Sequence, residues 1–590
     1  MSESNKNWKE TGNPQSYNLV IDKDVYVEMP DGVRLCVDVY RPDAPGRFPA
    51  LLAMGPYGKE LQTLNATFPP QPLHRSPVWD GNIEAGDYRE IVSRGYVHVV
   101  ADVRGTGKSE GEYIGWSPQE GKDGYQLVEW IARQPWCDGN VGMVGYSYYA
   151  KTQLKTAVNQ PPHLKAIYVS HVIVDVYREL AYHGGVLSLF PYGLWDGRHG
   201  TSGFAPKNAV SEMVKTLPKE ELERRRQQLL DNPDINNYPN VYHLLHYPYK
   251  NPMFFDILLN PFDGPFYAEK SVYPYFDKIK VPVYIVGKCA HGAQGYWYLW
   301  KGVKGVKKLL VKPSGPEERP WREDLEEIFR WFDYWLKGIN TGVLDEPPIK
   351  MYITGINQYR YLNEWPLPGI KWTKCYLRRW EGLLFAPELY QPEPDCFLQQ
   401  PLHLSTKRDY VQYLSPPVPE DIEVMGPCAL NFYAAIDQDD TNWIVTLYDV
   451  APHGAEMKLG KGYLKATHRA VDKNKSSPGE PYHPHTHADP VVPGQIYEYN
   501  IGLSVVTHVI RPGHRIKLRI ESMESPRDPE MQIHYHPHLC SSKTTVHKIY
   551  RNRQYQSHLL LPIIPKDGYE RIIRILSDDN LLGGSPEFGA

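Results

Sequence analysis

The sequence predicts an α/β protein in three parts: a mostly parallel sheet core, a helical segment inserted into it, and a C-terminal all-β domain. Up to about residue 170, short apolar runs flanked by turn residues alternate with amphipathic helical patterns, as in strand–helix–strand units. Helical, aromatic-rich sequence follows to residue 276, and short alternating strands dominate from about 345. A chain of 590 residues is also too long for a single core.

The core is predicted from apolar runs that are separated by helices. Four runs are expected to form its first strands: Phe48–Met54, Tyr96–Asp102, Val141–Val144 and Ala166–Ser170. Lys122–Gln134 lies between the second and third runs and has the apolar periodicity of a helix. After the insertion the core is expected to resume with two strands and a helix: Val281–Val286, Lys308–Val311 and Ile328–Lys337. This order implies parallel strands joined by crossover helices.

The remaining segments complete the predicted domain plan. Lys219–Leu230 follows Pro218 and reads as a charged amphipathic helix within the insertion. Beyond residue 345, Pro, Gly and Asp break short strands, a pattern typical of a jelly roll. We therefore expect a core from 1–171 and 277–344, a helical cap from 172–276, a jelly-roll domain from 345–575 and a loose tail from 576–590.

Composition narrows the class of protein. The net charge is −4 with both signs mixed, which favours neither nucleic acid nor a membrane surface as partner. Seven cysteines lack C-x-x-C spacing and are expected to be free thiols. The polar start and the lack of an eighteen-residue apolar run predict a cytoplasmic protein. We expect a small-molecule substrate, no cofactor and no metal, and leave a homodimer open.

The most informative motif is Gly145-Tyr-Ser-Tyr-Tyr-Ala150, which follows the apolar run Val141–Val144. A buried strand, a sharp turn that carries a serine and then a helix form the nucleophile elbow of α/β-hydrolases. Ala150 replaces the last glycine of the usual pattern, and alanine is small enough for the helix to pack closely on the strand. Ser147 is therefore the candidate nucleophile, and the fold is predicted to be an α/β-hydrolase.

Further motifs extend over nearly the whole chain. They are Asp102-Val-Arg-Gly-Thr-Gly-Lys-Ser-Glu-Gly111, Gly145–Tyr148, Arg330–Gly338, Asp440-Thr441, Asp449-Val450, Gly462–Ala466 and Pro512–Arg515. In this order and spacing, the chain resembles the CocE/NonD family of serine hydrolases, which includes cocaine esterase and X-Pro dipeptidyl-peptidases. The resemblance implies an α/β-hydrolase domain, a helical cap and a C-terminal jelly roll.

The resemblance also implies how an oxyanion would be held. In the family one donor is the backbone N–H after the nucleophile, which is that of Tyr148 here. The other is a tyrosine hydroxyl after an early strand, here Tyr57 in Gly55-Pro-Tyr-Gly-Lys59. Donors that are preorganised for a developing oxyanion contribute about 2.7–4 kcal/mol each.

The rest of the triad departs from the family pattern. Gly287-Lys-Cys-Ala-His291 places His291 where the family has its aspartate, and Lys312-Pro-Ser-Gly-Pro316 places Pro316 where the family has its histidine. A serine hydroxyl is a poor nucleophile without a base. Three interpretations remain open: a rebuilt hydrolase, a non-hydrolytic descendant that catalyses cyclisation, isomerisation or elimination of a bulky apolar molecule, and an inactive binding or scaffold protein.

In the rebuilt hydrolase, His291 acts as the base and Glu317 or Glu318 orients it, since triads are defined by geometry rather than chain order. His183 and His199 are weaker candidates for the base. The expected substrate is a small organic ester or amide, and proline-specific peptidase activity is the less favoured alternative.

The substrate is expected to contact aromatic residues near the cap. The stretch Ala181–Trp195 is dense in aromatics and glycine, which suits a lid over a bulky apolar ligand. Tyr149, Tyr182, His183 and Trp195 are the predicted contacts.

Overall fold

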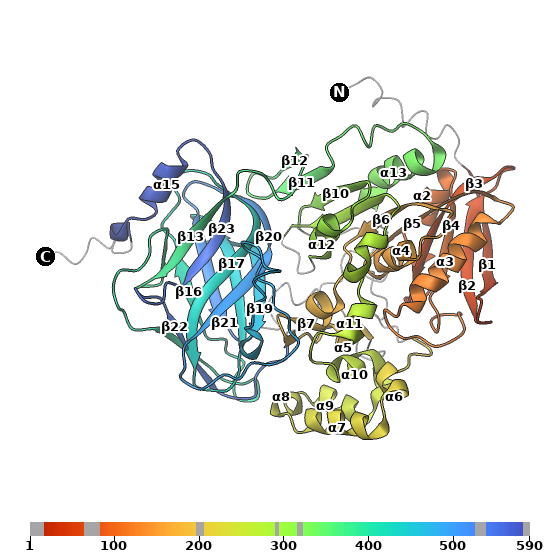
Figure 1. Cartoon of the computed structure of the whole chain (residues 1–590). Helices are drawn as coiled ribbons and strands as arrows, with labels where there is room; N and C mark the ends of the chain where they lie inside the picture. Colours follow the sequence, from red (N-terminus) through yellow and green to blue (C-terminus); the bar gives the residue numbers. More distant parts are fainter. Residues whose placement is uncertain are drawn as a thin grey trace.

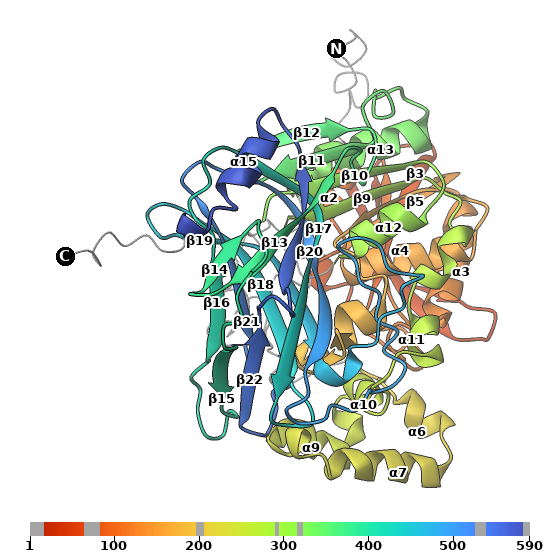
Figure 2. The same cartoon turned by 60° about the vertical axis from the view of Figure 1, so that its left-hand side comes forward.

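The computed structural model describes residues 17–63, 83–195, 206–289, 294–314, 322–524 and 538–581. An α/β core and an all-β domain lie side by side, and the inserted helices α6 to α9 lie below them (Figure 1). Turning the molecule shows β17 and β20 of the all-β domain facing the core (Figure 2). The predicted α/β core, helical insertion and C-terminal all-β domain are confirmed.

The core sheet contains ten strands within the described ranges, in the order β1-β2-β4-β3-β5-β6-β9-β10-β11-β12. Their bounds are β1 Leu19–Glu28, β2 Arg34–Pro42, β3 Phe48–Gly55, β4 Val97–Asp102, β5 Cys137–Tyr146, β6 Leu164–Ser170, β9 Val283–Lys288, β10 Lys307–Lys312, β11 Ile349–Ile353 and β12 Gln358–Leu362. From β4 to β11 neighbouring strands pair in parallel. The carboxyl ends of β5, β6, β9 and β10 therefore share one edge.

Helices cover both faces of the core sheet: α2 Tyr88–Ser93, α3 Gln119–Ala132, α4 Tyr148–Val158, α12 Gly295–Gly302 and α13 Leu325–Lys337. Successive strand residues point to opposite faces. Accordingly, Met143 packs in the same cluster as Leu154 of α4, whereas Val144 packs with Trp331 of α13. This two-sided burial explains why β5 reads as a continuous apolar run.

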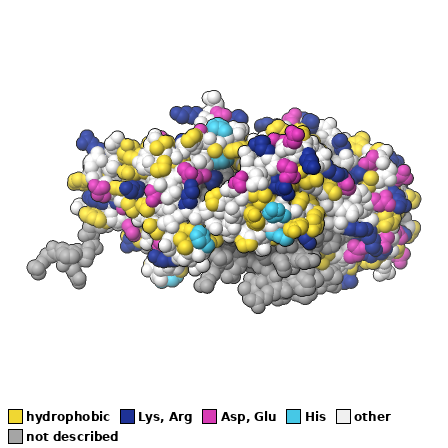
Figure 3. Space-filling view, turned by 90° about the horizontal axis from the view of Figure 1, so that it is seen from below, with side chains coloured by type: hydrophobic (Ala, Val, Ile, Leu, Met, Phe, Trp, Pro, Cys, Tyr) yellow, Lys and Arg dark blue, Asp and Glu magenta, His cyan; other side chains and the backbone are white. Residues whose placement is uncertain are grey.

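The insertion between β6 and β9 is mainly helical. It contains η4 Tyr177–Ala181, β7 Tyr182–His183, β8 Val186–Leu187, α5 Phe190–Trp195, α6 Glu212–Thr216, α7 Lys219–Leu230, α8 Pro233–Asn236, α9 Pro239–His246, η5 Pro248–Lys250, α10 Pro252–Leu258, α11 Pro265–Lys270 and η6 Tyr273–Lys278. The helix expected at Lys219–Leu230 is α7. From below, this side of the molecule shows acidic and basic side chains interspersed with apolar ones (Figure 3).

The all-β domain has its own apolar core. Its elements are β13 Lys371–Arg378, β14 Gly382–Leu384, β15 Asp395–Gln399, β16 Tyr410–Leu414, β17 Ile422–Ile436, β18 Asn442–Val450, β19 Glu456–Lys465, β20 Tyr497–Ile510, β21 Arg515–Glu521, β22 Thr545–Tyr550, β23 His558–Ile564 and α15 Tyr569–Ile575. Strand β17 is central, since it pairs with β20, β22 and β23.

The boundaries of the domains differ from the expected plan in two places. Strands β11 and β12 lie after residue 345 but belong to the core sheet, because β11 pairs in parallel with β10. At the C-terminal end, Leu576 is buried in the core of the all-β domain and Asp579 pairs with Arg378. Ordered chain therefore continues into the predicted tail. Among the helices of the described ranges, none combines the length and apolarity needed to cross a bilayer.

Candidate active site

The elbow at Ser147 has the geometry that the motif predicts. Strand β5 ends at Tyr146 and helix α4 begins at Tyr148, and the residue between them has φ 53° and ψ −113°. This backbone conformation is sparsely populated and is typical of a nucleophile elbow. The Ser147 side chain is half-buried and does not cap α4 with a hydrogen bond. Its N–H donates to the Ser170 carbonyl at 2.9 Å, which ties the elbow to β6.

Glu84 contacts the elbow on both sides of the serine. Its backbone carbonyl accepts the Tyr146 N–H at 3.0 Å, and its carboxylate oxygen Oε2 accepts the Tyr148 N–H at 3.2 Å. Gln62 holds this segment, because its Oε1 accepts the N–H groups of Glu84 at 2.7 Å and Ala85 at 3.1 Å. A buried carboxylate therefore occupies the donor that we expected to bind an oxyanion.

Tyr57 lies in the loop after β3, where the resemblance predicts the second oxyanion donor. Its side chain is buried, and its ring centroid lies 6.0 Å from that of Tyr148. Asp102, at the end of β4, holds the loop by accepting the Lys59 N–H at 2.7 Å. Burial raises the pKa of this aspartate to about 7. The Tyr57 ring thus packs near the ring of Tyr148, the residue that follows Ser147.

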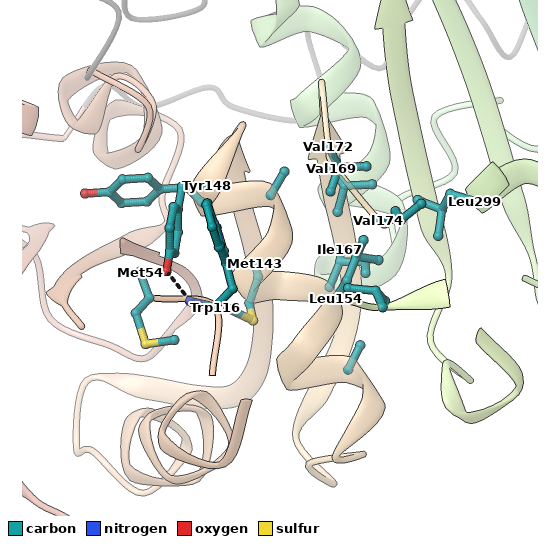
Figure 4. Close-up of a cluster of buried hydrophobic side chains, with 14 of the residues drawn as sticks. Met54, Trp116, Met143, Tyr148, Leu154, Ile167, Val169, Val172, Val174 and Leu299 are labelled. Atoms are coloured by element: carbon teal, nitrogen blue, oxygen red, sulfur yellow. Dashed lines mark hydrogen bonds between the residues drawn. The ribbon is translucent and has the colours of Figure 1, made fainter. Parts of the chain in front are cut away.

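The side chain of Tyr148 is held below the elbow. Its hydroxyl donates to Glu120 and accepts from the Tyr113 hydroxyl at 2.9 Å and the Trp116 N–H at 3.1 Å. Figure 4 shows the Trp116 contact within the apolar cluster around β5. Burial, followed by the charge of Glu120, raises the pKa of Tyr148 well above its usual value. Tyr148 therefore turns its backbone N–H rather than its hydroxyl toward Glu84.

Several residues that the sequence predicts for the site fall in parts of the chain that the structure does not describe. His291, Pro316, Glu317, Glu318 and His199 all lie outside the described residues.

His171, which the sequence reasoning missed, follows β6 directly, and its ring stacks on Tyr146 at 4.3 Å. Its Nδ1 lies 2.9 Å from Ser170 Oγ, and its backbone φ is 52°. Its place directly after the apolar run Ala166–Ser170 is the sequence signal that could have identified it.

The predicted substrate contacts make internal contacts instead. Tyr149 is fully buried and its ring fills the space beside Gly55, which places it in the core rather than on an open wall. Tyr182 donates to the Ile257 carbonyl at 3.1 Å. The Nδ1 of His183 lies 2.7 Å from His538 Nε2. Trp195 ends α5, and its side chain lies outside the described residues.

A pocket of about 790 Å³ opens at the same sheet edge, but not at the elbow. It lies at the carboxyl ends of β9 and β10 and is lined by paired charges, such as Lys312 and Asp324 at 2.8 Å. Neither Ser147 nor Glu84 lines it. Since the chemistry requires the elbow, we assign the site to Ser147 rather than to this pocket.

All seven cysteines are free thiols. Within the described ranges, no group of three or more His, Cys, Asp or Glu side chains is arranged to hold a metal ion. His534 and His536, which alternate with His538 along the chain, lie outside those ranges.

Comparison with known families identifies the two domains. The model for X-Pro dipeptidyl-peptidase (S15 family) matches residues 31–315, and the model for the X-Pro dipeptidyl-peptidase C-terminal non-catalytic domain matches residues 341–560. The chain belongs to the CocE/NonD family of α/β-hydrolases. The predicted family resemblance is confirmed, and the elbow, the insertion and the all-β domain are those of a hydrolase family of esterases and peptidases.

Individual members of the CocE/NonD family are similar over their full length. The cocaine esterase of Rhodococcus sp. is 26% identical, with 93% of this chain and 99% of that protein covered. A putative serine esterase of Mycobacterium bovis is 25% identical, with 91% and 95% covered. Among solved structures, a CocE/NonD family hydrolase from Staphylococcus aureus has a TM-score of 0.73 at 23% identity, with 92% and 94% covered. An α-amino acid ester hydrolase has a TM-score of 0.72 at 17% identity, with 93% and 97% covered. These structural likenesses show the shared fold.

Proposed function

We propose that the protein hydrolyses a small organic ester or amide through Ser147. The observation that carries the proposal is the strained elbow, where Ser147 has φ 53° and makes no capping hydrogen bond to α4. A backbone strain of this kind persists only when the surrounding structure holds it, and it is common at catalytic residues. In this proposal Ser147 attacks the carbonyl carbon, and the Tyr148 N–H and the Tyr57 hydroxyl bind the oxyanion.

His291 is the base that the sequence predicts, in place of the usual aspartate–histidine pair. Support comes from its position after β9, because the carboxyl ends of β5, β6 and β9 share one edge of the sheet. The hydroxyl proton of Ser147 would pass to His291 and then to the leaving alcohol or amine.

A second candidate function is a non-hydrolytic reaction on a bulky apolar molecule in the same site. The Glu84 carboxylate at the Tyr148 N–H favours it, since an anion already held at this donor opposes the binding of an oxyanion. In that case Glu84 would act on the substrate directly and Ser147 would form no covalent bond.

Labelling with a fluorophosphonate distinguishes the two functions. We expect the wild-type protein to gain the mass of one phosphonyl group, and Ser147→Ala to gain none, because only an activated serine oxygen displaces fluoride. Intact-mass spectrometry measures the labelled fraction over time.

The matched control is Ser170→Ala, which removes a hydroxyl from the end of the neighbouring strand and should leave labelling intact. If the folded wild-type protein stays unlabelled for hours, the hydrolytic proposal is wrong. Turnover that survives in Ser147→Ala, without release of an alcohol or amine, would support the second candidate.

A further inference from the structure

Glu84 binds the backbone on both sides of the proposed nucleophile. Its carbonyl and its carboxylate bind the N–H groups of Tyr146 and Tyr148, which are the residues before and after Ser147. The side chain is 4% exposed. The backbone contact alone would tie Glu84 to the elbow, and the carboxylate adds a proton acceptor at the N–H of the residue that follows Ser147.

The position of this carboxylate is supported from a second direction. Gln62 Oε1 binds two consecutive N–H groups, those of Glu84 and Ala85, and Gln62 lies five residues after Tyr57. The loop that carries the predicted second oxyanion donor therefore also fixes the backbone of Glu84. Gln62 thus links the loop of Tyr57 to Glu84, which in turn binds the N–H groups on both sides of Ser147.

We propose that Glu84 is the general base of this site, and that proton uptake by its carboxylate releases the Tyr148 N–H to the oxyanion. The inference rests on the proposed hydrolytic function and replaces His291 in the role of base. A charged carboxylate accepts a hydrogen bond more strongly than a neutral carboxyl group does. Protonation of Glu84 therefore weakens its hold on this donor at the step in which the substrate oxygen needs it.

The proposed reaction has two stages, the acylation of Ser147 and the hydrolysis of the acyl-enzyme. The Ser147 O–H bond breaks, its proton goes to Glu84, and an Oγ–C bond forms while the carbonyl electron pair moves to oxygen. The tetrahedral intermediate collapses, the bond to the leaving group breaks, and Glu84 returns the proton to the alkoxide or amine. Glu84 then takes a proton from water, the hydroxide adds to the acyl carbon, and the proton returns to Ser147 as the acid leaves.

The test compares fluorophosphonate labelling rates of four proteins: the wild type, Glu84→Gln, Glu84→Ala and His291→Ala. Glutamine keeps the size of the side chain and a carbonyl acceptor for the Tyr148 N–H, but it cannot take a proton. We expect Glu84→Gln to be labelled about 10²–10⁴-fold more slowly than the wild type, and more slowly than His291→Ala. In Glu84→Ala, added formate should restore labelling, whereas the same concentration of chloride should not.

The outcomes separate the inference from the function on which it rests. An unlabelled wild-type protein rejects the hydrolytic function itself. If the wild type is labelled and Glu84→Gln matches or exceeds its rate, Glu84 is not the base. Loss of labelling in His291→Ala but not in Glu84→Gln assigns the base to His291. Rescue by formate requires a carboxylate in the reaction, and a purely structural role of Glu84 would not produce it.

Discussion

Lys151 lies one helical turn after Ser147 and carries its amino group into the interior. The side chain is buried, and within the described residues its Nζ has no hydrogen-bond partner. The Trp116 ring lies 5.0 Å away. Burial, followed by the charge of Lys155, lowers the pKa of Lys151 well below its usual value. The folded protein therefore holds the proton of this amine more weakly than the unfolded chain does.

Lys151→Met should stabilise the protein by about 1–3 kcal/mol at neutral pH, because it removes a buried polar group that has no partner. The unfolded wild-type chain binds more protons than the folded one, so wild-type stability rises with pH. The gain should consequently shrink as the pH approaches 10.5, the ordinary lysine value. Thermal unfolding of both proteins at several pH values measures the difference.

Lys155→Met is the matched control, since Lys155 lies one turn further along the same helix. Its Nζ donates to the carbonyl oxygens of Trp116 and Ser117, so its removal should destabilise the protein. Equal effects of the two substitutions would contradict this interpretation of Lys151.

The sequence predicts those residues of the candidate site that have a local signature. Ser147, the Tyr148 N–H and the Tyr57 loop follow from short motifs and a family resemblance. Glu84 has no such signature, because its role depends on a hydrogen bond across 64 residues of chain. Tyr149 is predicted to contact the substrate, but its ring fills the space beside Gly55 and its Cβ lies against Gly145.

At the scale of elements, a buried charged network joins β7 of the insertion to the all-β domain. Glu524 pairs with Lys461, and its carboxylate lies 2.7 Å from His538 Nδ1. The other ring nitrogen of His538, Nε2, lies 2.7 Å from His183 Nδ1. Burial alone would raise the pKa of Glu524. The charges of Lys461 and His538 instead hold this pKa well below its usual range. The Lys465 N–H also donates to the Gly184 carbonyl at 2.8 Å.

Glu524→Gln should destabilise the protein by about 3–5 kcal/mol near neutral pH, because it leaves the buried Lys461 cation without its counter-charge. The stabilising effect of a carboxylate with a depressed pKa is present above its unfolded value and lost below it. The difference from the wild type should therefore shrink as the pH falls below 4.5. Chemical denaturation at a series of pH values checks both points.

Glu570→Gln serves as the comparison, since Glu570 pairs with Lys371 at an exposed position and should change the unfolding free energy little. An equally small effect of Glu524→Gln would refute the network's contribution.

Periodicity predicted the core elements well, because a two-sided parallel sheet requires continuous apolar runs. It did not assign β11 and β12, whose alternating burial is also typical of strands in an antiparallel sandwich. Which sheet they join depends on pairing with β10, and no local pattern specifies that choice.

At the scale of the whole molecule, the core and the all-β domain share an interior. Val505 and Val509 of β20 pack in the same apolar cluster as the core strands. The Thr354 N–H donates to the Thr507 carbonyl of β20 at 3.1 Å, and the Thr354 carbonyl accepts the Val509 N–H at 3.0 Å. The Cys289 thiol at the end of β9 lies 3.4 Å from Thr507 Oγ1. These contacts couple the two folding units.

The protein should therefore unfold in one cooperative transition. Calorimetry should give a single peak, and near-ultraviolet and far-ultraviolet circular dichroism should report the same midpoint, as in a two-state process. Two separated peaks, or a midpoint that differs between probes, would mean that the domains unfold independently.

The pairing of β11 and β12 with β10 also decides where the polypeptide can be divided. A fragment that stops at residue 344 would leave β10 with a row of unpaired N–H and C=O groups, and such an exposed, apolar edge recruits other chains into aggregates. A fragment that continues to Leu362 keeps β10 covered and ends on β12, whose Tyr359 and Tyr361 are exposed. Expression of the catalytic half alone, or its exchange between relatives, is therefore best planned with a junction after Leu362.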